Sequence, residues 1–319
     1  MVANSQRRPL VLLSMGGGYC SRQRLSLTNV SRTDRAVIDL LCPRALRFDN
    51  RADTVQGGRM SNPFSRKLHS VATLPAEDLA LVDEVIADQF TAPARTDLIC
   101  EGEAPKYVHL LLSGVACRSK YQAEGGRQIV SYLIPGDLCD VHIRLLGEMD
   151  HTVSTITECQ IVRIAPKQID QLMSRPAIAT AMWWSTLMEQ SILREWVVNI
   201  ATRPAKQRMA HLFCELYVRL RAVGLTVDHR FKLPLTQQEL GETMGLSTVH
   251  VNRALQALRA EGLIVLHQKE LEILDAKRLV ELAEFNAAYL HFGAAEGEAH
   301  QGSSEIDKGP DARHARRPV

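Results

Sequence analysis

The sequence predicts an α+β protein in which a region of short strands is followed by one long helix and then by a winged helix-turn-helix domain. Three observations lead to this fold class. Short apolar segments separated by Gly and Pro turns fill the first part of the folded region, residues 178–200 lack any internal Gly or Pro, and a helical pattern at 235–264 is interrupted once. At roughly 100–200 residues per domain, the chain has room for about two domains.

The composition is that of an ordinary globular protein. With 45% hydrophobic residues, 23% charged residues and a net charge of +2, any contact with DNA must come from local clustering of polar and basic groups. No apolar run approaches the ~18 residues of a membrane-spanning helix, so we expect no membrane association. The seven cysteines form no C-x-x-C pair, which favours reduced thiols and a cytoplasmic location.

The two ends of the chain differ from the rest. Residues 1–59 contain ten Arg but no Lys and no Glu, and we expect this segment to be disordered. Because Met60 opens a sequence typical of folded protein, our hypothesis is that translation begins there, and the alternative is a disordered N-terminal arm. Residues 293–319 are rich in Gly, Ser and charged groups, and we expect a disordered tail.

Residues 60–175 are predicted to form a strand-rich domain that opens with a short helix at 76–96. Glu124-Gly125-Gly126 suits a hairpin turn between the first two of its strands. Short strands separated by Gly and Pro turns indicate a β-sandwich or barrel. The strand signals lie at 107–112, 128–134, 153–156 and 160–164.

The segment 176–201 is predicted to be one long helix. It carries more apolar surface than a single packing face requires. We expect part of this surface to form the interface of a homodimer; the alternative is a helix buried inside the monomer. The residues predicted at the dimer interface are Met188, Ile192, Trp196 and Ile200.

A helix-turn-helix at 235–264 explains why the helical pattern stops at Gly245 and restarts at once. Thr236 is a good N-cap, and Glu239 completes a capping box. Gly245 supplies the left-handed conformation that ends the first helix, and Ser247 caps the second. So short a turn holds two helices at a steep angle.

The second of these helices has two faces. Val251, Leu255 and Leu258 repeat at i, i+4 and i+7 and are predicted to face the core. The opposite face carries residue types that read base edges in the major groove. The residues predicted to contact DNA are Thr248, Val249, Asn252, Arg253, Ser247, His250, Gln237 and Lys269.

A short hairpin is predicted directly after the second helix. Strand signals at 264–266 and 271–274 flank residues 267–270, which is the pattern of the wing of a winged helix. The tip of such a wing can contact phosphate. The whole C-terminal domain is placed at 202–292 and begins with a helix at 206–221. An ordinary αα-hairpin with a solvated outer face is the alternative, which the wing disfavours.

The order of a β-roll, a long helix and a winged helix-turn-helix resembles the Crp/Fnr family of bacterial transcription regulators over residues 76–275. The resemblance implies a cyclic-nucleotide-binding-like β-roll (a double-stranded β-helix), a homodimer with the long helix as its coiled-coil seam, and binding to a palindrome on double-stranded DNA. It also implies that the roll at 60–175 is a sensory domain and that RNA polymerase is a partner. The motifs that carry it are Glu101-Gly102-Glu103, Leu112-Ser113-Gly114, Pro135-Gly136-Asp137-Leu138 and the whole of 235–264.

The family's cyclic-nucleotide site does not carry over to this sequence. Members that bind cyclic AMP follow a Gly-Glu-Leu turn with an Arg-Ser pair that holds the phosphate. Here the turn contains Asp137, and the loop after it contains Glu148 and Asp150, which would repel a phosphate. Arg144 is the only cation expected nearby. We therefore expect no cyclic nucleotide, because a buried phosphate needs a counter-charge.

No other cofactor is expected. An iron–sulfur cluster usually needs four thiolates, and after Met60 the first cysteine is Cys100. A haem bound by His109, His142 or His151 has no support in the sequence, and no metal site is predicted. Cys214 is either a small buried hydrophobe or a candidate redox-sensitive thiol.

The main prediction is a sequence-specific transcription regulator. The alternatives are a nucleotide-binding regulatory subunit that acts on a protein partner, or a scaffold that only dimerises. The sequence contains no P-loop, nucleophile elbow or H-E-x-x-H motif, so we expect neither an enzyme nor catalytic residues. Arg253 matches the family's guanine-reading Arg, whereas Val249 stands where the best-known members have Glu, so the operator is expected to differ.

Overall fold

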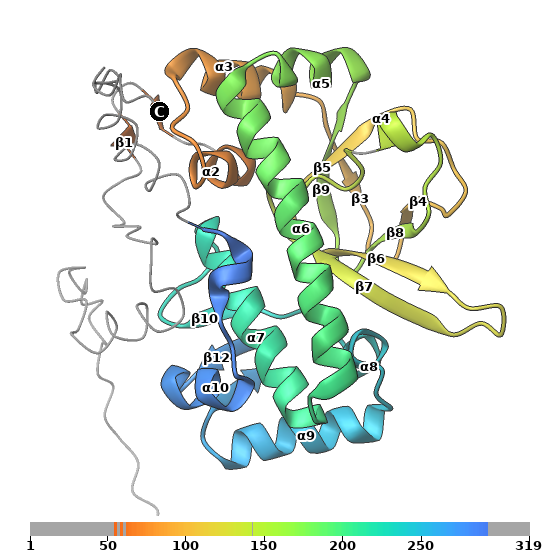
Figure 1. The fold of residues 1–319 in the computed structure, drawn as a ribbon, viewed down its shortest axis with the longest axis vertical. Helices are drawn as coiled ribbons and strands as arrows, with labels where there is room; N and C mark the ends of the chain where they lie inside the picture. Colours follow the sequence, from red (N-terminus) through yellow and green to blue (C-terminus); the bar gives the residue numbers. More distant parts are fainter. Residues whose placement is uncertain (1–53, 56–57, 60–61, 142, 293–319) are drawn as a thin grey trace, which may run out of the picture.

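The computed structural model describes residues 54–55, 58–59, 62–141 and 143–292 (Figure 1). Its elements follow the predicted order of a strand-rich roll, a long central helix and a helical domain with a small sheet. Most of the leader expected to be disordered, the proposed start at Met60, His142 and the tail at 293–319 lie outside the described residues. No helix in the described part of the chain is long and apolar enough to cross a membrane.

Short elements precede the roll. β1 (Thr54–Val55) and β2 (Gly58–Arg59) pair with each other. α2 (Pro63–His69) and α3 (Ala76–Val85) contribute to one apolar cluster with α5 (Pro166–Met173) and the start of the long helix. This cluster attaches the N-terminal helices to the roll.

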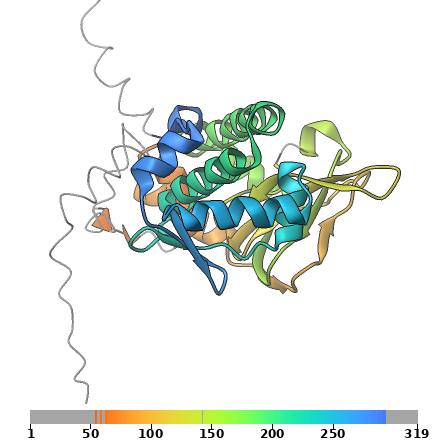
Figure 2. The same ribbon diagram turned by 90° about the horizontal axis from the view of Figure 1, so that it is seen from below.

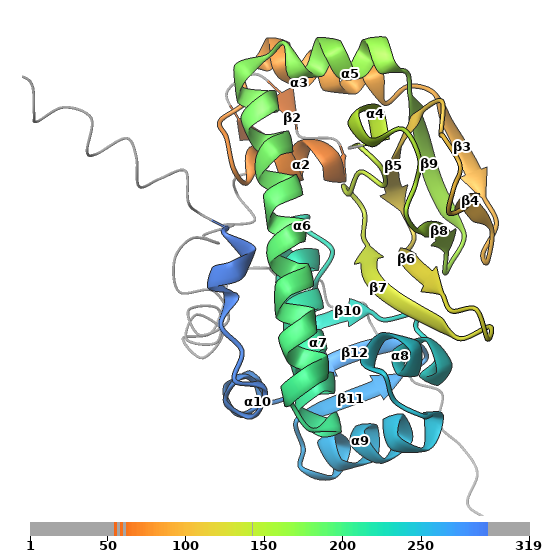
Figure 3. The ribbon, with the colours of Figure 1, turned by 45° about the vertical axis from the view of Figure 1, so that its right-hand side comes forward.

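The roll consists of two antiparallel sheets whose facing sides enclose an apolar core that includes Ile99, Leu111 and Val153 (Figure 3). The strands run in the orders β3-β9-β5 and β4-β8-β6-β7. A short helix, α4 (Ile143–Leu146), lies between β7 and β8. The strands are β3 (Gln89–Ala92), β4 (Asp97–Ile99), β5 (Val108–Ser113), β6 (Ala116–Tyr121), β7 (Arg127–Leu133), β8 (Thr152–Thr155) and β9 (Cys159–Ile164).

Two predictions for the roll are wrong. The helix expected at 76–96 ends at Val85, because the following segment pairs with β9 as strand β3. The hairpin across Glu124–Gly126 joins β7 to β6, a strand that was not predicted, and β5 pairs with β9 instead. Gly114, directly after β5, has to be glycine, because its φ is +88° and a Cβ there would lie within 2.4 Å of the carbonyl oxygen of Glu158.

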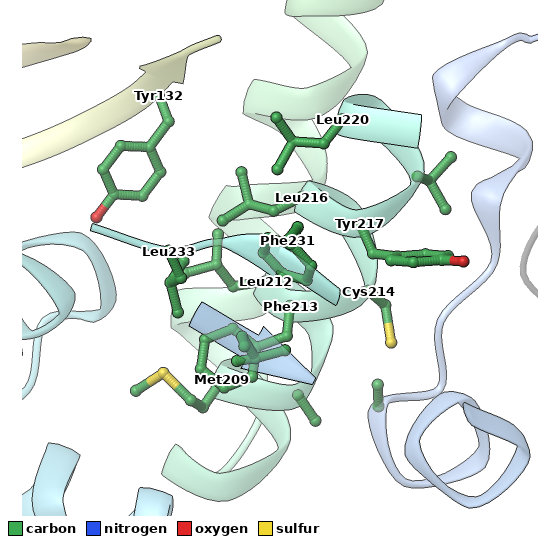
Figure 4. Close-up of a cluster of buried hydrophobic side chains, with 14 of the residues drawn as sticks. Tyr132, Met209, Leu212, Phe213, Cys214, Leu216, Tyr217, Leu220, Phe231 and Leu233 are labelled. Atoms are coloured by element: carbon green, nitrogen blue, oxygen red, sulfur yellow. The ribbon is translucent and has the colours of Figure 1, made fainter. Parts of the chain in front are cut away.

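The central helix, α6 (Pro176–Thr202), runs along both the roll and the C-terminal domain (Figures 1 and 3). α7 (Ala205–Ala222) follows after the break at Arg203-Pro204 and packs beside the lower part of α6. Figure 4 shows how α7 forms the centre of the C-terminal core. Met209, Phe213 and Leu216 point from this helix into the cluster and are buried.

The C-terminal domain is the predicted winged helix-turn-helix. Its sheet has the order β10-β12-β11, and a short 3₁₀ segment, η1, ends the described chain. The elements are β10 (Arg230–Lys232), α8 (Gln237–Met244), α9 (Thr248–Ala260), β11 (Ile264–His267), β12 (Glu270–Ile273), α10 (Ala276–Ala283) and η1 (Ala287–Leu290).

A buried ionic network joins the roll to α7. Asp137, in the turn after β7, lies 2.7 Å from Lys67 Nζ of α2 and 3.1 Å from Arg219 Nη2 of α7. Arg219 also contacts Glu215, at 3.2 Å, and donates to the carbonyl oxygen of Tyr132. Burial alone would raise the pKa of Asp137, but the two cations outweigh burial and hold that pKa below its usual value. The carboxylate is therefore charged in the folded protein.

We predict that Arg219→Met destabilises the protein by about 3–5 kcal/mol, because the change removes the cation paired with buried Glu215 and one of the two cations paired with buried Asp137. Arg230→Met is the matched control, since its partner Glu272 lies on the exposed side of the wing sheet and exposed pairs contribute about 0–1 kcal/mol. Urea unfolding of both variants measures the difference. Equal losses would contradict the structural role of the network.

We also predict an acid sensitivity that comes from His211, which is buried beneath Tyr289. Burial, reinforced by Arg203, lowers the pKa of His211 to about 3, although Nε2 lies 3.2 Å from Glu195. Glu195 is already paired with Arg203 at 2.8 Å, which fits a neutral imidazole.

Because an unfolded histidine titrates near pH ~6.5, its contribution to stability is complete above that pH. Below that pH, the free energy of unfolding falls by about 1.4 kcal/mol per pH unit until the pH reaches the pKa of His211 in the folded protein. His211→Phe is expected to flatten the decline in unfolding free energy between about pH 6 and about pH 4. Urea titrations of the wild type and the variant at several pH values measure this slope. Identical slopes would show that His211 does not titrate in this way.

Candidate nucleic-acid interface

The start of α8 is fixed by the predicted capping box. The amide of Glu239 donates to Thr236 Oγ1 at 3.1 Å, and the amide of Thr236 donates to Glu239 Oε2 at 2.7 Å. These reciprocal bonds satisfy backbone donors that a helix N-terminus leaves open. Leu240 and Met244 face the core, as predicted.

The turn between α8 and α9 depends on two glycines. Gly245 has a φ of +64°, which confirms the predicted left-handed end of α8. Gly241 was not singled out in the sequence. A Cβ there would come within 2.5 Å of the carbonyl oxygen of Leu246, so only glycine lets the turn fold back onto α8. Ser247 then caps α9 through its hydroxyl oxygen, as predicted.

The two faces of α9 are those that the spacing predicts. Val251, Leu255 and Leu258 are at most 2% exposed and pack into the core around α7. The other face is exposed, and Val249 has 56% of its surface accessible. α9 forms the lower end of the molecule in Figure 1 and lies across the view from below in Figure 2. The predicted DNA contacts on this exposed face are Thr248, Val249, Asn252 and Arg253.

Polar contacts orient several of these side chains. Asn252 Nδ2 donates to Gln237 Oε1 at 3.4 Å, and Ser247 Oγ lies 2.9 Å from His250 Nδ1. Arg253 makes no hydrogen bond or ion pair with any residue that the structure describes. Its guanidinium therefore keeps all its donors for a ligand, and its planar fork suits bidentate contact with a guanine edge.

The wing lies beside the end of α9. β11 and β12 pair across a turn in which Gln268 and Lys269 both have positive φ, of 48° and 62°. This is the turn geometry that fits the twist of a tight hairpin. Lys269 lies in this turn and is exposed.

Comparisons with known proteins agree with this architecture. The cyclic nucleotide-binding domain family matches residues 89–176, and the Crp-like helix-turn-helix domain family matches residues 207–282. The chain belongs to the Crp/Fnr family of transcription regulators. It is accordingly a DNA-binding transcription regulator, and members of this family typically act as dimers.

Several relatives span most of the folded region of this Crp/Fnr regulator. The transcriptional activator protein FnrL of Cereibacter sphaeroides is 28% identical and covers 66% of this chain and 86% of its own. The nitrogen fixation regulation protein FixK of Azorhizobium caulinodans is 23% identical, with coverage of 65% and 83%. Among solved structures, FixK2 from Bradyrhizobium japonicum shares the fold, with a TM-score of 0.55, 21% identity and coverage of 62% and 98%.

The residues predicted for the dimer interface need correction. Met188, Ile192 and Trp196 are at most 4% exposed within the single chain and belong to the core around α7. A second chain could not contact them unless this core opened. Only Ile200 is partly exposed. Helical spacing identified a real apolar face, but that face packs against the chain itself.

The interior of the roll contains a cation that the sequence analysis missed. Arg118, on β6, lies 3.1 Å from Glu189 Oε2 on α6 and donates to the carbonyl oxygens of Leu138 and Cys139. The expectation that Arg144 is the only nearby cation is therefore wrong. The first four residues of β6 are all buried without alternation, so no period in the sequence indicated that Arg118 lies inside.

Two of the histidines considered for haem, His109 and His151, lie in the described part of the chain and have local partners. His109 Nδ1 lies 3.1 Å from Asp140, which is fully buried, and His151 Nδ1 lies 2.6 Å from Asp150. Within the described residues, no group of His, Cys, Asp and Glu is arranged to hold a metal ion.

Cys214 lies in the core formed by α7 and is fully buried (Figure 4). Burial raises the pKa of its thiol far above the ordinary range, so little thiolate forms at neutral pH. This environment contradicts a redox-sensitive thiol and favours the other interpretation, a small buried hydrophobe.

We predict that Arg253→Ala lowers affinity for a specific operator by ~1–3 kcal/mol and relaxes the base preference at one position in each half-site. Lys277→Ala is the control, because it removes the same charge from α10, where Lys277 is exposed. Gel-shift titration of both variants on the same operator measures the effect. Equal affinities would contradict the placement of Arg253 in the groove.

Proposed function

We propose that this regulator acts in the cytoplasm as a homodimer that binds a palindromic operator, with one α9 in the major groove of each half-site. The observation that carries the proposal is the division of α9 into a buried apolar face and an exposed face of base-reading types. A helix face that only contacts water can consist of charged residues alone. This face presents Asn252, Arg253 and the methyl groups of Val249, which match the edges of adenine, guanine and thymine.

The operator is expected to differ from the site of the best-known members. Val249 stands where those members have Glu, so the acceptor for a cytosine amino group is absent. Asn252 precedes Arg253 and adds a side chain that can pair bidentately with adenine. Gln237 holds Asn252 from the neighbouring helix and thereby restricts the direction in which the amide points.

The seam that we propose for the dimer is the exposed side of α6. Seven of its exposed residues follow one another in steps of three and four, which is the spacing of a and d positions in a coiled coil. Trp183, Leu187 and Val197 on this stripe are 56%, 61% and 68% exposed, high values for large apolar side chains. The full stripe is Thr180, Trp183, Leu187, Gln190, Arg194, Val197 and Ala201.

A dimer in which the two α6 helices pair in parallel would suit a palindromic operator. Two-fold symmetry about the seam places both copies of α9 at the same end of the dimer. Half-sites one helical turn apart require the two reading helices to be roughly 34–36 Å apart. RNA polymerase is the further partner that we propose for the DNA-bound dimer.

No ligand is needed in this proposal. The guanidinium of Arg118, which could otherwise serve as a counter-charge for a phosphate, is already bound by Glu189 and two carbonyl oxygens. Asp137 is likewise satisfied by Lys67 and Arg219. We propose that neither cyclic nucleotide, iron–sulfur cluster nor haem is required for DNA binding.

We predict that Leu187→Glu converts the protein to a monomer and lowers affinity for a palindromic operator by at least about tenfold, because a like-charged pair would replace an apolar contact in the seam. Val227→Glu is the control, since Val227 is 71% exposed and lies in the C-terminal domain rather than on α6. Sedimentation equilibrium gives the oligomeric state, and gel shift gives the affinity. A Leu187→Glu protein that remains dimeric would refute this seam.

A further inference from the structure

The last described segment of the chain lies along α6. After α10, residues 284–292 run up the side of α6 that is opposite to the roll (Figures 1 and 3). Trp184 Nε1 donates to the carbonyl oxygen of His291 at 3.2 Å, and Ser191 Oγ lies 3.4 Å from His291 Nε2. The ring of Phe292 packs on Trp184, with centroids 5.4 Å apart. The family match for the helix-turn-helix ends at residue 282, so this segment lies beyond it.

The segment is anchored from beneath by buried side chains. Tyr289 donates its hydroxyl to Glu215 Oε2 at 2.9 Å, and the same carboxylate accepts from Trp196 Nε1 at 3.0 Å. Leu290 is fully buried. Ala288 and His291, by contrast, are exposed. The segment is thus held against α6 and α7, and its outer edge, formed by Ala288 and His291, is exposed.

An open pocket lies between this edge and α6, with a volume of about 420 Å³. Its α6 side is formed by Ser191, Arg194, Glu195 and Val198, and its other side by Ala288, Tyr289 and His291. Arg194 belongs to the exposed stripe of α6 and turns towards the pocket, where it donates to Ser191 Oγ at 2.7 Å. The pocket is therefore continuous with the proposed dimer seam.

Heptad positions identify what would fill the pocket. If the stripe residues occupy positions a and d of the seven-residue repeat abcdefg, then Ser191 and Val198 occupy e positions and Leu193 occupies a g position. In a parallel coiled coil, g of one helix faces e of the next heptad on the other helix, so Leu193 faces the partner's Val198. Leu193 is half-buried in the single chain and lies on the opposite flank of α6 from the pocket. A second copy would bring it to the pocket mouth.

We infer that residues 284–292 form part of the dimer interface, where Ala288 and His291 build one wall of a pocket that receives the partner's Leu193. The inference rests on the proposed dimer but goes beyond it, because it assigns a role to a segment outside the helix-turn-helix match. It widens the seam from a two-helix contact to one that includes a C-terminal strap (residues 284–292). Each dimer has two such pockets by symmetry.

The test is a double-mutant cycle on the full-length protein, read by sedimentation equilibrium. Ala288→Arg and Leu193→Ala are each expected to raise the dimer dissociation constant by about tenfold or more, and the double variant by clearly less than the product, because both remove the same contact. Glu281→Arg is the control, since it adds charge to α10 at a position 60% exposed. An Ala288→Arg protein with the wild-type constant, or effects that simply multiply, would overturn the inference.

The variant Leu187→Glu separates this inference from the proposed dimer. If Leu187→Glu dissociates the dimer and Ala288→Arg does not, the seam stands and the strap does not contribute. If Leu187→Glu also has no effect, the seam itself is wrong.

A cross-linking experiment covers the case in which Ala288→Arg fails to fold. Cys20, Cys42 and Cys100 are replaced by Ser, and Ala288→Cys is combined with Leu193→Cys. The two positions lie on opposite flanks of α6, so an oxidised bond between them is expected only between chains. A covalent dimer that requires both cysteines supports the strap, and monomer after complete oxidation overturns it.

Discussion

The burial of one side of α9 is the constraint on which the functional account depends. Val251, Leu255 and Leu258 are removed from water against α7, and each such side chain contributes about 1.5–3 kcal/mol by burial. Rotating α9 to hide Arg253 would expose all three and bury an unpaired guanidinium. The exposed face is thus fixed by the core, and the base-reading side chains need no ligand to bring them to the surface.

The roll and the reading domain are joined by polar contacts as well as by α6. Tyr132 of β7 contacts Thr243 of α8 through its hydroxyl, and Gln128 donates to the carbonyl oxygen of Thr243 at 3.2 Å. Arg219 lies between Tyr132 and Asp137, fully buried. The contacts of Tyr132 and Gln128 hold α8 against β7 of the roll.

The sequence predicted the C-terminal domain better than the roll, for physical reasons. The capping box at Thr236 and the left-handed Gly245 are local features that dictate their own conformation. Pairing in the roll depends on distant partners, so β3 and β6 were missed and the hairpin was assigned to the wrong strand. The apolar residues of α6 cover more than one face, and spacing alone could not show that Trp196 faces its own chain while Val197 faces outwards. Arg118 was missed because its counter-charge, Glu189, comes from another element.

The most direct test of the account is a methylation-interference footprint on a selected operator with the wild type and Arg253→Ala. Dimethyl sulfate modifies guanine N7 in the major groove and adenine N3 in the minor groove. The account predicts interference at one guanine in each half-site, on the same face of the duplex about one turn apart, and loss of that interference in the variant. An unchanged footprint, or interference confined to adenine N3, would contradict the placement of α9 in the major groove.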